Sequence, residues 1–175
     1  MSRFSTLNNM KQLILVRHAK SDAGDTGRQD IDRQLAARGI RDAHHVAEWL
    51  LQHCQSTDQL VTSSADRALH TAMIFSRTLA IPSTKIVIEP MVYEAPAAAL
   101  YKVIRALPPT ADKVLMFGHN PGFTDVANDL ARDFYIDNLP TCGVVGFSLP
   151  INSWSEASQG SALHLFHYFP KLATT

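Results

Sequence analysis

Short apolar runs alternate with longer segments of helical periodicity along most of this chain. The apolar runs have the length of buried strands and cover residues 12–16, 59–62, 85–88 and 113–117. The intervening and following segments carry apolar residues at three- and four-residue spacing and cover residues 35–54, 65–79, 96–107 and 121–132. Strands that alternate with helices in this way predict a mostly parallel sheet with helices on both of its faces.

The C-terminal part of the chain has a different pattern. Residues 144–149 and 162–169 resemble two strands, and the polar stretch 152–160 joins them as a turn. His164 and His167, three residues apart, are expected on opposite faces of the last strand. We therefore expect a three-layer α/β/α sandwich whose parallel sheet ends in an antiparallel edge hairpin, formed by one domain over residues 1–175 with its core at about 12–169.

Composition excludes several classes of partner. Sixteen basic residues balance sixteen acidic ones, so no overall field attracts nucleic acid or a membrane surface. The N-terminal residues 1–11 lack the apolar centre of a signal peptide, and no stretch reaches the roughly 18 apolar residues of a membrane span. Cys54 and Cys142 are isolated, which favours reduced thiols. We expect a cytoplasmic protein.

Polar residues suited to anion binding follow three of the predicted strands. Arg17 and His18 come directly after the first strand, Arg67 opens the helix after the second, and His119 follows the fourth. The carboxyl ends of parallel strands meet at one edge of a sheet, so these four side chains should converge. An arginine fork binds phosphate oxygens in pairs. The set predicts a site for a tetrahedral dianion.

Two helix N-termini should support the same site. Asn120 followed by Pro121 has the pattern of an N-cap and a first helical residue, and Ser63 or Ser64 can cap the helix of Arg67. The free N–H groups and the dipole of a helix N-terminus favour phosphate. These features indicate phosphoryl chemistry.

Elimination leaves histidine as the nucleophile. The chain has no glycine-rich loop ending in Lys-Ser or Lys-Thr, neither cysteine begins an arginine-closed loop, and Asp30 and Asp32 do not follow a strand. His18 attacking phosphorus would give a phosphohistidine intermediate. Its imidazole must then be neutral, which the two arginines and a helix N-terminus favour, and its other nitrogen should donate to a backbone carbonyl.

These residues resemble the motifs of the histidine phosphatase superfamily, branch 1, and within it the small SixA-like phosphohistidine phosphatases. The matching segments are Val16-Arg17-His18-Ala19-Lys20-Ser21, Ser63-Ser64 with Arg67, and Gly118-His119-Asn120-Pro121. The resemblance implies a phosphoglycerate mutase-like fold and a metal-independent phosphohydrolase without a cofactor. It implies catalytic roles for Arg17, His18, Arg67 and His119, with Lys20, Ser21 and Asn120 as substrate contacts.

The resemblance also bears on the proton donor and the substrate. Glu94 stands where many relatives carry the acid that protonates the leaving group, although an ordinary surface glutamate fits the position equally well. The chain lacks the long insertions that form a lid in larger relatives, so an open, shallow site is expected. Such a site suits a phosphorylated protein, for example a phosphohistidine domain.

Two alternatives to a protein phosphohistidine phosphatase stay open. The substrate could be a small phosphorylated molecule, either an ester or an anhydride. A protein of another class, a phosphate- or phosphoprotein-binding module without turnover, could also carry the same residues. No nucleic-acid or membrane partner is expected.

Overall fold

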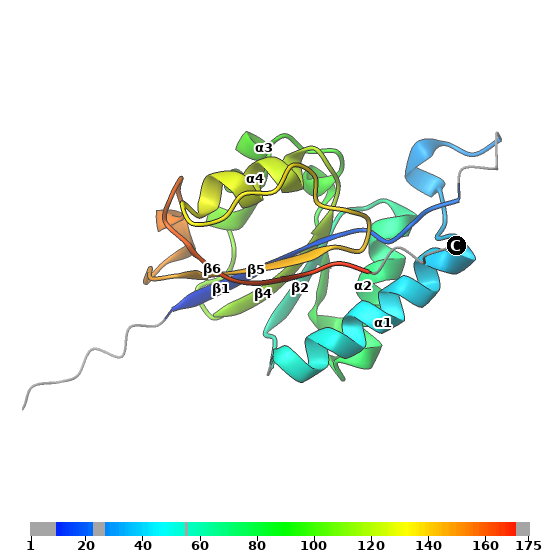
Figure 1. Ribbon diagram of the computed structural model, residues 1–175, viewed down its shortest axis with the longest axis horizontal. Coiled ribbons are helices and arrows are strands. Elements are labelled where there is room, and N and C mark those ends of the chain that lie inside the picture. Colours follow the sequence, from blue (N-terminus) through cyan, green and yellow to red (C-terminus); the bar gives the residue numbers. More distant parts are fainter. Residues whose placement is uncertain (1–9, 23–26, 55, 171–175) are drawn as a thin grey trace, which may run out of the picture.

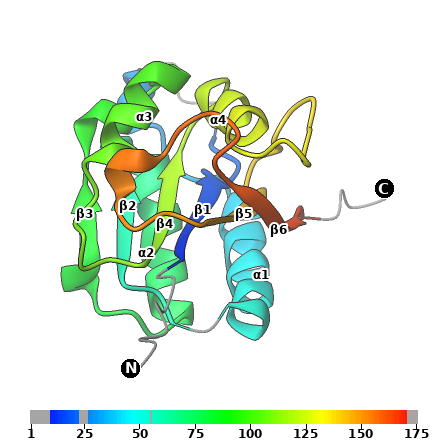
Figure 2. The ribbon, with the colours of Figure 1, turned by 90° about the vertical axis from the view of Figure 1, so that its left-hand side faces the viewer.

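The computed structural model describes residues 10–22, 27–54 and 56–170 and contains one six-stranded sheet. Figure 2 shows the strands edge to edge in the order β3-β2-β4-β1-β5-β6. The first four are parallel, and β5 and β6 are antiparallel to their neighbours. The strands are β1 Lys11–Arg17, β2 Gln59–Thr62, β3 Ile86–Ile88, β4 Lys113–Gly118, β5 Val144–Leu149 and β6 Leu163–Tyr168.

Helices cover both faces of the sheet, as Figure 1 shows, with α1 and α2 on one side and α3 and α4 on the other. The α-helices are α1 Ala37–His53, α2 Asp66–Thr78, α3 Ala97–Arg105 and α4 Gly122–Leu130. Four short 3-10 helices join them: η1 Asp30–Asp32, η2 Ser83–Lys85, η3 Pro90–Val92 and η4 Trp154–Glu156. The predicted three-layer sandwich with an antiparallel edge hairpin is confirmed.

Strand β1 shows why the sheet needs both helical layers. Leu13 and Leu15 pack into the core on the α3 and α4 side, whereas Ile14 and Val16 pack into the core on the α1 and α2 side. All four are at most 1% exposed. A strand buried on both faces reads as a continuous apolar run, which explains why this segment shows no alternation in the sequence.

The strand register brings the predicted site residues to one edge. Arg17 at the end of β1 lies opposite Gly118 at the end of β4, and the N–H of His18 donates to the Gly118 carbonyl at 3.0 Å. On the other side of β4, the N–H of Ser63 donates to the Phe117 carbonyl at 3.0 Å. Three strands therefore end at the same level of the sheet.

The hairpin region departs from the sequence prediction in two respects. The 152–160 turn is not only polar, because Trp154 is 1% exposed and its indole N–H donates to the Ala111 carbonyl at 2.7 Å. His164 and His167 do not point to opposite faces: a β-bulge opposite Gly146 and Phe147 interrupts the alternation. Their ring nitrogens lie 3.2 Å apart.

Within the described part of the chain, none of the helices has the length and apolar character needed to cross a membrane.

Candidate active site

His18 lies just beyond the end of β1 and is 9% exposed. Its Nδ1 is 2.8 Å from the Ala19 carbonyl oxygen, so Nδ1 carries the proton and donates. Its Nε2 is thereby left with a free lone pair, as expected for a nucleophile. The predicted backbone hydrogen bond of the second ring nitrogen is present.

The chain after His18 is tied to α2. The N–H of Ala19 donates to Thr71 Oγ1 at 3.1 Å, and the Thr71 hydroxyl donates to the Arg67 carbonyl at 2.6 Å. Further along, Gly39 of α1 packs against the backbone of Lys20, where a Cβ on residue 39 would come within 2.1 Å of the Lys20 carbonyl oxygen. These contacts fix the position of the imidazole relative to both helices.

Burial is the main reason that the His18 imidazole is neutral. Burial, reinforced by nearby positive charge, lowers the pKa of His18 to about 4, against a smaller opposing effect of the hydrogen bond to Ala19. The positive charges belong to three guanidinium groups, those of Arg67, Arg17 and Arg33. The sequence predicts a neutral His18 because of two arginines and a helix N-terminus. In the structure, the largest cause of its lowered pKa is desolvation by burial.

The two expected arginines approach His18 from different elements. Arg67, in the first turn of α2 and 3% exposed, directs its Nε–H to His18 Nε2 at 3.4 Å. Arg17 donates from one terminal nitrogen to the Leu139 carbonyl at 2.8 Å. Its Nε is buried and finds no hydrogen-bond partner among the described residues. A buried donor without a partner is costly, so a ligand oxygen here would be stabilising.

His119 completes the predicted set. Its ring centroid is 5.1 Å from that of His18, and its Nε2 lies 2.7 Å from the Ser63 hydroxyl. Burial, together with the charges around it, lowers the pKa of His119 to about 3. A neutral imidazole has one N–H, so His119 can donate one hydrogen bond without bringing a full charge into the site.

Ser63 does not act as the N-cap of α2, which is Ala65. Its hydroxyl accepts from the Ala65 N–H at 3.2 Å and contacts His119. Ser63 therefore positions the second histidine. The sequence shows that Ser63 directly follows a strand. It does not show whether the Ser63 hydroxyl caps a helix or binds a histidine.

Asp30 and Arg33 belong to the site, although neither was among the predicted catalytic and substrate-binding residues. The Asp30 Oδ2 accepts from Arg67 at 2.8 Å and from the Tyr93 hydroxyl at 2.9 Å, and its Oδ1 accepts from Arg33 at 2.9 Å. Partial burial raises the pKa of Asp30, but the three hydrogen bonds outweigh it and hold the pKa far below its usual range. The carboxylate is ionised.

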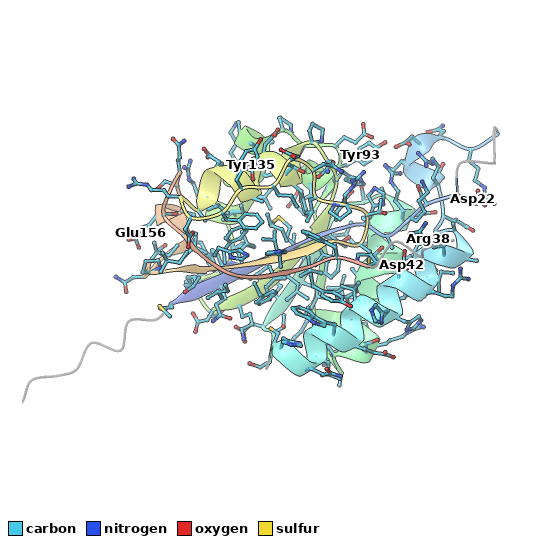
Figure 3. The ribbon with its side chains drawn as sticks, viewed as in Figure 1. Asp22, Arg38, Asp42, Tyr93, Tyr135 and Glu156 are labelled. Atoms are coloured by element: carbon cyan, nitrogen blue, oxygen red, sulfur yellow. The ribbon has the colours of Figure 1, made fainter. Side chains whose placement is uncertain are left out.

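Short helix η1 makes the mouth of the site less open than the sequence predicts. Asp30 lies directly against the buried Arg67 and is itself 44% exposed at its side chain. Tyr93 packs edge-on against His119, with ring centroids 5.4 Å apart. In Figure 3, Tyr93 lies near the carboxyl end of the sheet, whereas Glu156 lies at the opposite end of the molecule.

Glu94 faces the same mouth from the loop before α3. Its Oε1 is 3.8 Å from a terminal nitrogen of Arg67, and its side chain is 59% exposed. Its backbone has φ of 46°, in the left-handed region that only a few per cent of residues other than glycine adopt. Such a conformation costs about 1–3 kcal/mol and is found preferentially at functional sites. The placement is compatible with the predicted acid.

The three predicted substrate contacts occupy different surroundings. Lys20 is exposed, whereas Ser21 is buried and its hydroxyl accepts from Arg33 at 2.7 Å. Asn120 does not cap α4, which begins at Gly122. Its amide instead donates to the Leu139 carbonyl at 2.9 Å, the same oxygen that Arg17 contacts, and to the Asn138 side chain at 2.8 Å.

Metal coordination is not a feature of this arrangement. Across the ranges that the structure describes, no three side chains of His, Cys, Asp and Glu are grouped so that they could hold a metal ion. The positive groups that an anion would meet are guanidinium groups.

Comparison with known proteins agrees with this geometry. Residues 13–95 match the model of the histidine phosphatase superfamily (branch 1), a range that contains Arg17, His18, Arg67 and Glu94 but not His119. An uncharacterized protein of Mycobacterium tuberculosis is 27% identical over 165 residues, which cover 89% of this chain and all of the relative.

Two solved structures share the fold over nearly their whole length. One is a SixA protein of Nakamurella multipartitia assigned as a phosphohistidine phosphatase, with a TM-score of 0.80, 23% identity and coverage of 93% of this chain and 97% of the other. The second is the SixA protein of Agrobacterium tumefaciens with the same assignment, with a TM-score of 0.77, 21% identity and coverage of 91% and 98%.

The family model covers the segments of Arg17, His18 and Arg67, and the structure places His119 beside His18 at the same edge of a phosphoglycerate mutase-like sheet. Residues 13–95 are thus similar to the histidine phosphatase superfamily, branch 1, and the chain shares its fold with the two SixA proteins.

Proposed function

We propose that this protein is a phosphatase that acts without a metal through a phosphohistidine intermediate at His18, and that its substrate is phosphohistidine in a protein. One observation carries the mechanism: the buried His18 imidazole has its Nδ1 proton held by the Ala19 carbonyl, while its Nε2 meets the Arg67 Nε–H. A neutral ring with one nitrogen fixed and the other unprotonated can attack an electrophile once the Arg67 Nε–H shifts from Nε2 to a phosphoryl oxygen.

In the first step, His18 Nε2 attacks phosphorus while the bond from phosphorus to the leaving group breaks. The Nε–H groups of Arg17 and Arg67 lie where they can donate to the equatorial oxygens. His119 adds its N–H as negative charge develops on those oxygens. The leaving group departs with the electron pair of the broken bond and takes up a proton.

In the second step, water enters on the side that the leaving group has vacated. Its oxygen bonds to phosphorus as the phosphorus–nitrogen bond breaks, and the electron pair of that bond returns to His18 Nε2. Inorganic phosphate and neutral His18 are the products. The proton that water loses passes to a phosphate oxygen or to Glu94, whose carboxylate faces the mouth.

Two features favour phosphohistidine as the substrate. Imidazole, with a pKa of about 6.5, is a far better leaving group than a phenolate with a pKa of about 10. His18 also keeps 9% of its surface exposed, and Asp30, which binds Arg67 at the mouth, is 44% exposed at its side chain. A phosphorylated side chain displayed on a protein could therefore reach the site from solvent. The two SixA proteins of the same fold carry this assignment as well.

Hydrolysis of a small phosphate ester is the second candidate, and the placement of Glu94 favours it. An ester leaving group needs a proton, and the Glu94 carboxylate lies at the mouth of the site, 3.8 Å from a terminal nitrogen of Arg67. The positive φ of Glu94 is an uncommon backbone conformation, and it suits a side chain that must be held in one orientation toward the leaving group. The two candidates therefore differ in their dependence on Glu94.

The first prediction concerns the nucleophile. In the presence of a chelator, the wild-type protein should hydrolyse a phosphohistidine-bearing protein, and more slowly an aryl phosphate. His18→Ala should lose more than about 1000-fold of both activities, because no other group replaces the attacking nitrogen. Release of inorganic phosphate measures the rates.

His44→Ala is the matched control, since His44 is exposed on α1 and should leave both rates unchanged. Activity that survives in His18→Ala would contradict the assigned nucleophile. Phosphate binding without any turnover in the wild-type protein would indicate a phosphate-binding module instead of an enzyme.

The second prediction separates the two substrates. Glu94→Gln removes the proton donor but keeps the shape of the side chain. We expect the rate on phosphohistidine to fall less than about threefold, since imidazole leaves without strong assistance, and the rate on an aryl phosphate to fall about 100-fold. An equal loss on both substrates would argue against this division of roles.

The third prediction follows from the pKa of His18. An ordinary histidine is protonated below about pH 6.5. His18 has a pKa of about 4, so its imidazole stays neutral until the pH falls to about 4. The value of kcat/KM, which reports the free enzyme, should therefore show no loss due to His18 from about pH 8 to 5 and should fall as the pH drops through about 4. NMR titration of the His18 imidazole gives the same pKa without a substrate.

The lowered pKa also affects stability. Between about pH 6.5 and 4, the unfolded chain binds protons at His18 and His119 that the folded protein does not bind, so the free energy of unfolding should decrease as the pH falls through this range. A His18 titration near pH 6.5 in the folded protein would contradict the account.

A further inference from the structure

Asp30 is the meeting point of three donors that come from three separate elements. Its carboxylate accepts from Arg67 of α2, from Arg33 directly after η1, and from Tyr93 directly after η3. Its backbone carbonyl accepts a second hydrogen bond from Arg67 at 2.5 Å. One residue outside the predicted set thus holds two of the guanidinium groups that surround His18.

The pair of hydrogen bonds from Arg67 fixes the orientation of its guanidinium. Both terminal nitrogens of Arg67 bind Asp30, one through the carbonyl and one through the carboxylate. The remaining nitrogen, Nε, is then directed to His18 Nε2, the atom that takes up phosphorus in the proposed reaction. A guanidinium held on one edge presents its other edge in a defined direction, because its five N–H groups lie in a rigid plane.

Asp30 also places a negative charge next to an anion-binding site. The Asp30 carboxylate, which is hydrogen-bonded to Arg67, repels a phosphate dianion and offsets part of the attraction of the arginines. An acidic group would therefore weaken phosphate binding in a site designed only for affinity. Its presence makes sense if orientation of Arg67 at the transition state contributes more to the rate than the lost attraction removes.

We propose that Asp30 is the positioning residue of the phosphoryl site: it aligns Arg67 and Arg33 for transfer to His18 and, through its charge, limits the affinity for phosphate. The proposal rests on the function assigned above, in which His18 accepts the phosphoryl group. It predicts that removing the charge of Asp30 has opposite effects on catalysis and on anion binding.

The experiment compares Asp30→Asn with the wild-type protein. An asparagine keeps the backbone carbonyl that binds Arg67 but has one side-chain acceptor oxygen in place of two, so its side chain cannot bind Arg67 and Arg33 through separate oxygens, and kcat should fall at least about tenfold. Inhibition by inorganic phosphate should become about three- to tenfold stronger, because the repelling charge is gone. Steady-state kinetics with inorganic phosphate as the inhibitor gives both values.

Asp32→Asn is the control for charge alone. Asp32 lies on the same 3-10 helix and is exposed, and within the described ranges no hydrogen bond or ion pair of its carboxylate to the site is found. We expect kcat and phosphate inhibition within about twofold of the wild-type values. If Asp32→Asn reproduced the effects of Asp30→Asn, general electrostatics would explain them and the proposal would be wrong.

Tyr93→Phe supplies a second test that leaves the ion pairs in place. It removes only the hydroxyl that donates to Asp30 Oδ2, so kcat should fall about two- to fivefold with unchanged phosphate inhibition. Circular dichroism verifies that each variant is folded.

The outcomes separate this proposal from the proposed function. If the wild-type protein turns over and Asp30→Asn has a kcat within twofold of it, Asp30 is not a positioning residue. Asp30 is also not a positioning residue if Asp30→Asn lowers kcat and weakens phosphate binding in parallel. If the wild-type protein fails to turn over, the proposed function itself is wrong.

Discussion

The parallel pairing of β1 with β4 is the interaction on which the site depends. It sets Arg17 opposite Gly118 and thereby brings His18 beside His119, with ring centroids 5.1 Å apart. A shift of one residue in this register would turn each side chain of β1 to the other face of the sheet. At the end of the pair, the hydrogen bond from the His18 N–H to the Gly118 carbonyl holds this register.

Burial then determines the chemistry that the converged residues can perform. The imidazoles of His18 and His119 are removed from water among guanidinium groups, so both stay neutral where an ordinary histidine would begin to protonate. The positive charge that neutralises a phosphoryl group is left to the arginines. Asp30 restores a negative charge to this cluster and ties the guanidinium of Arg67 to the mouth of the site.

The sequence predicted the layers, the antiparallel edge hairpin and the four residues that the structure brings together at the carboxyl ends of the strands, because strand ends and helical periodicity are local patterns. It could not predict the role of Asp30, whose three partners lie 3, 37 and 63 residues away. Asn120 was expected to cap a helix, and only the tertiary contact with Leu139 shows that it does not. The pairing of His164 with His167 likewise depends on a bulge that the hydrophobic pattern does not reveal.

The most direct test of this account is to trap the covalent intermediate. The protein is mixed briefly with a substrate carrying a radiolabelled phosphoryl group, quenched in alkali and digested for mass spectrometry. The account predicts one labelled peptide, with phosphate on the His18 imidazole, stable in alkali and labile in acid. Turnover that proceeds without such a peptide, or a label on any other residue, would contradict covalent catalysis by His18.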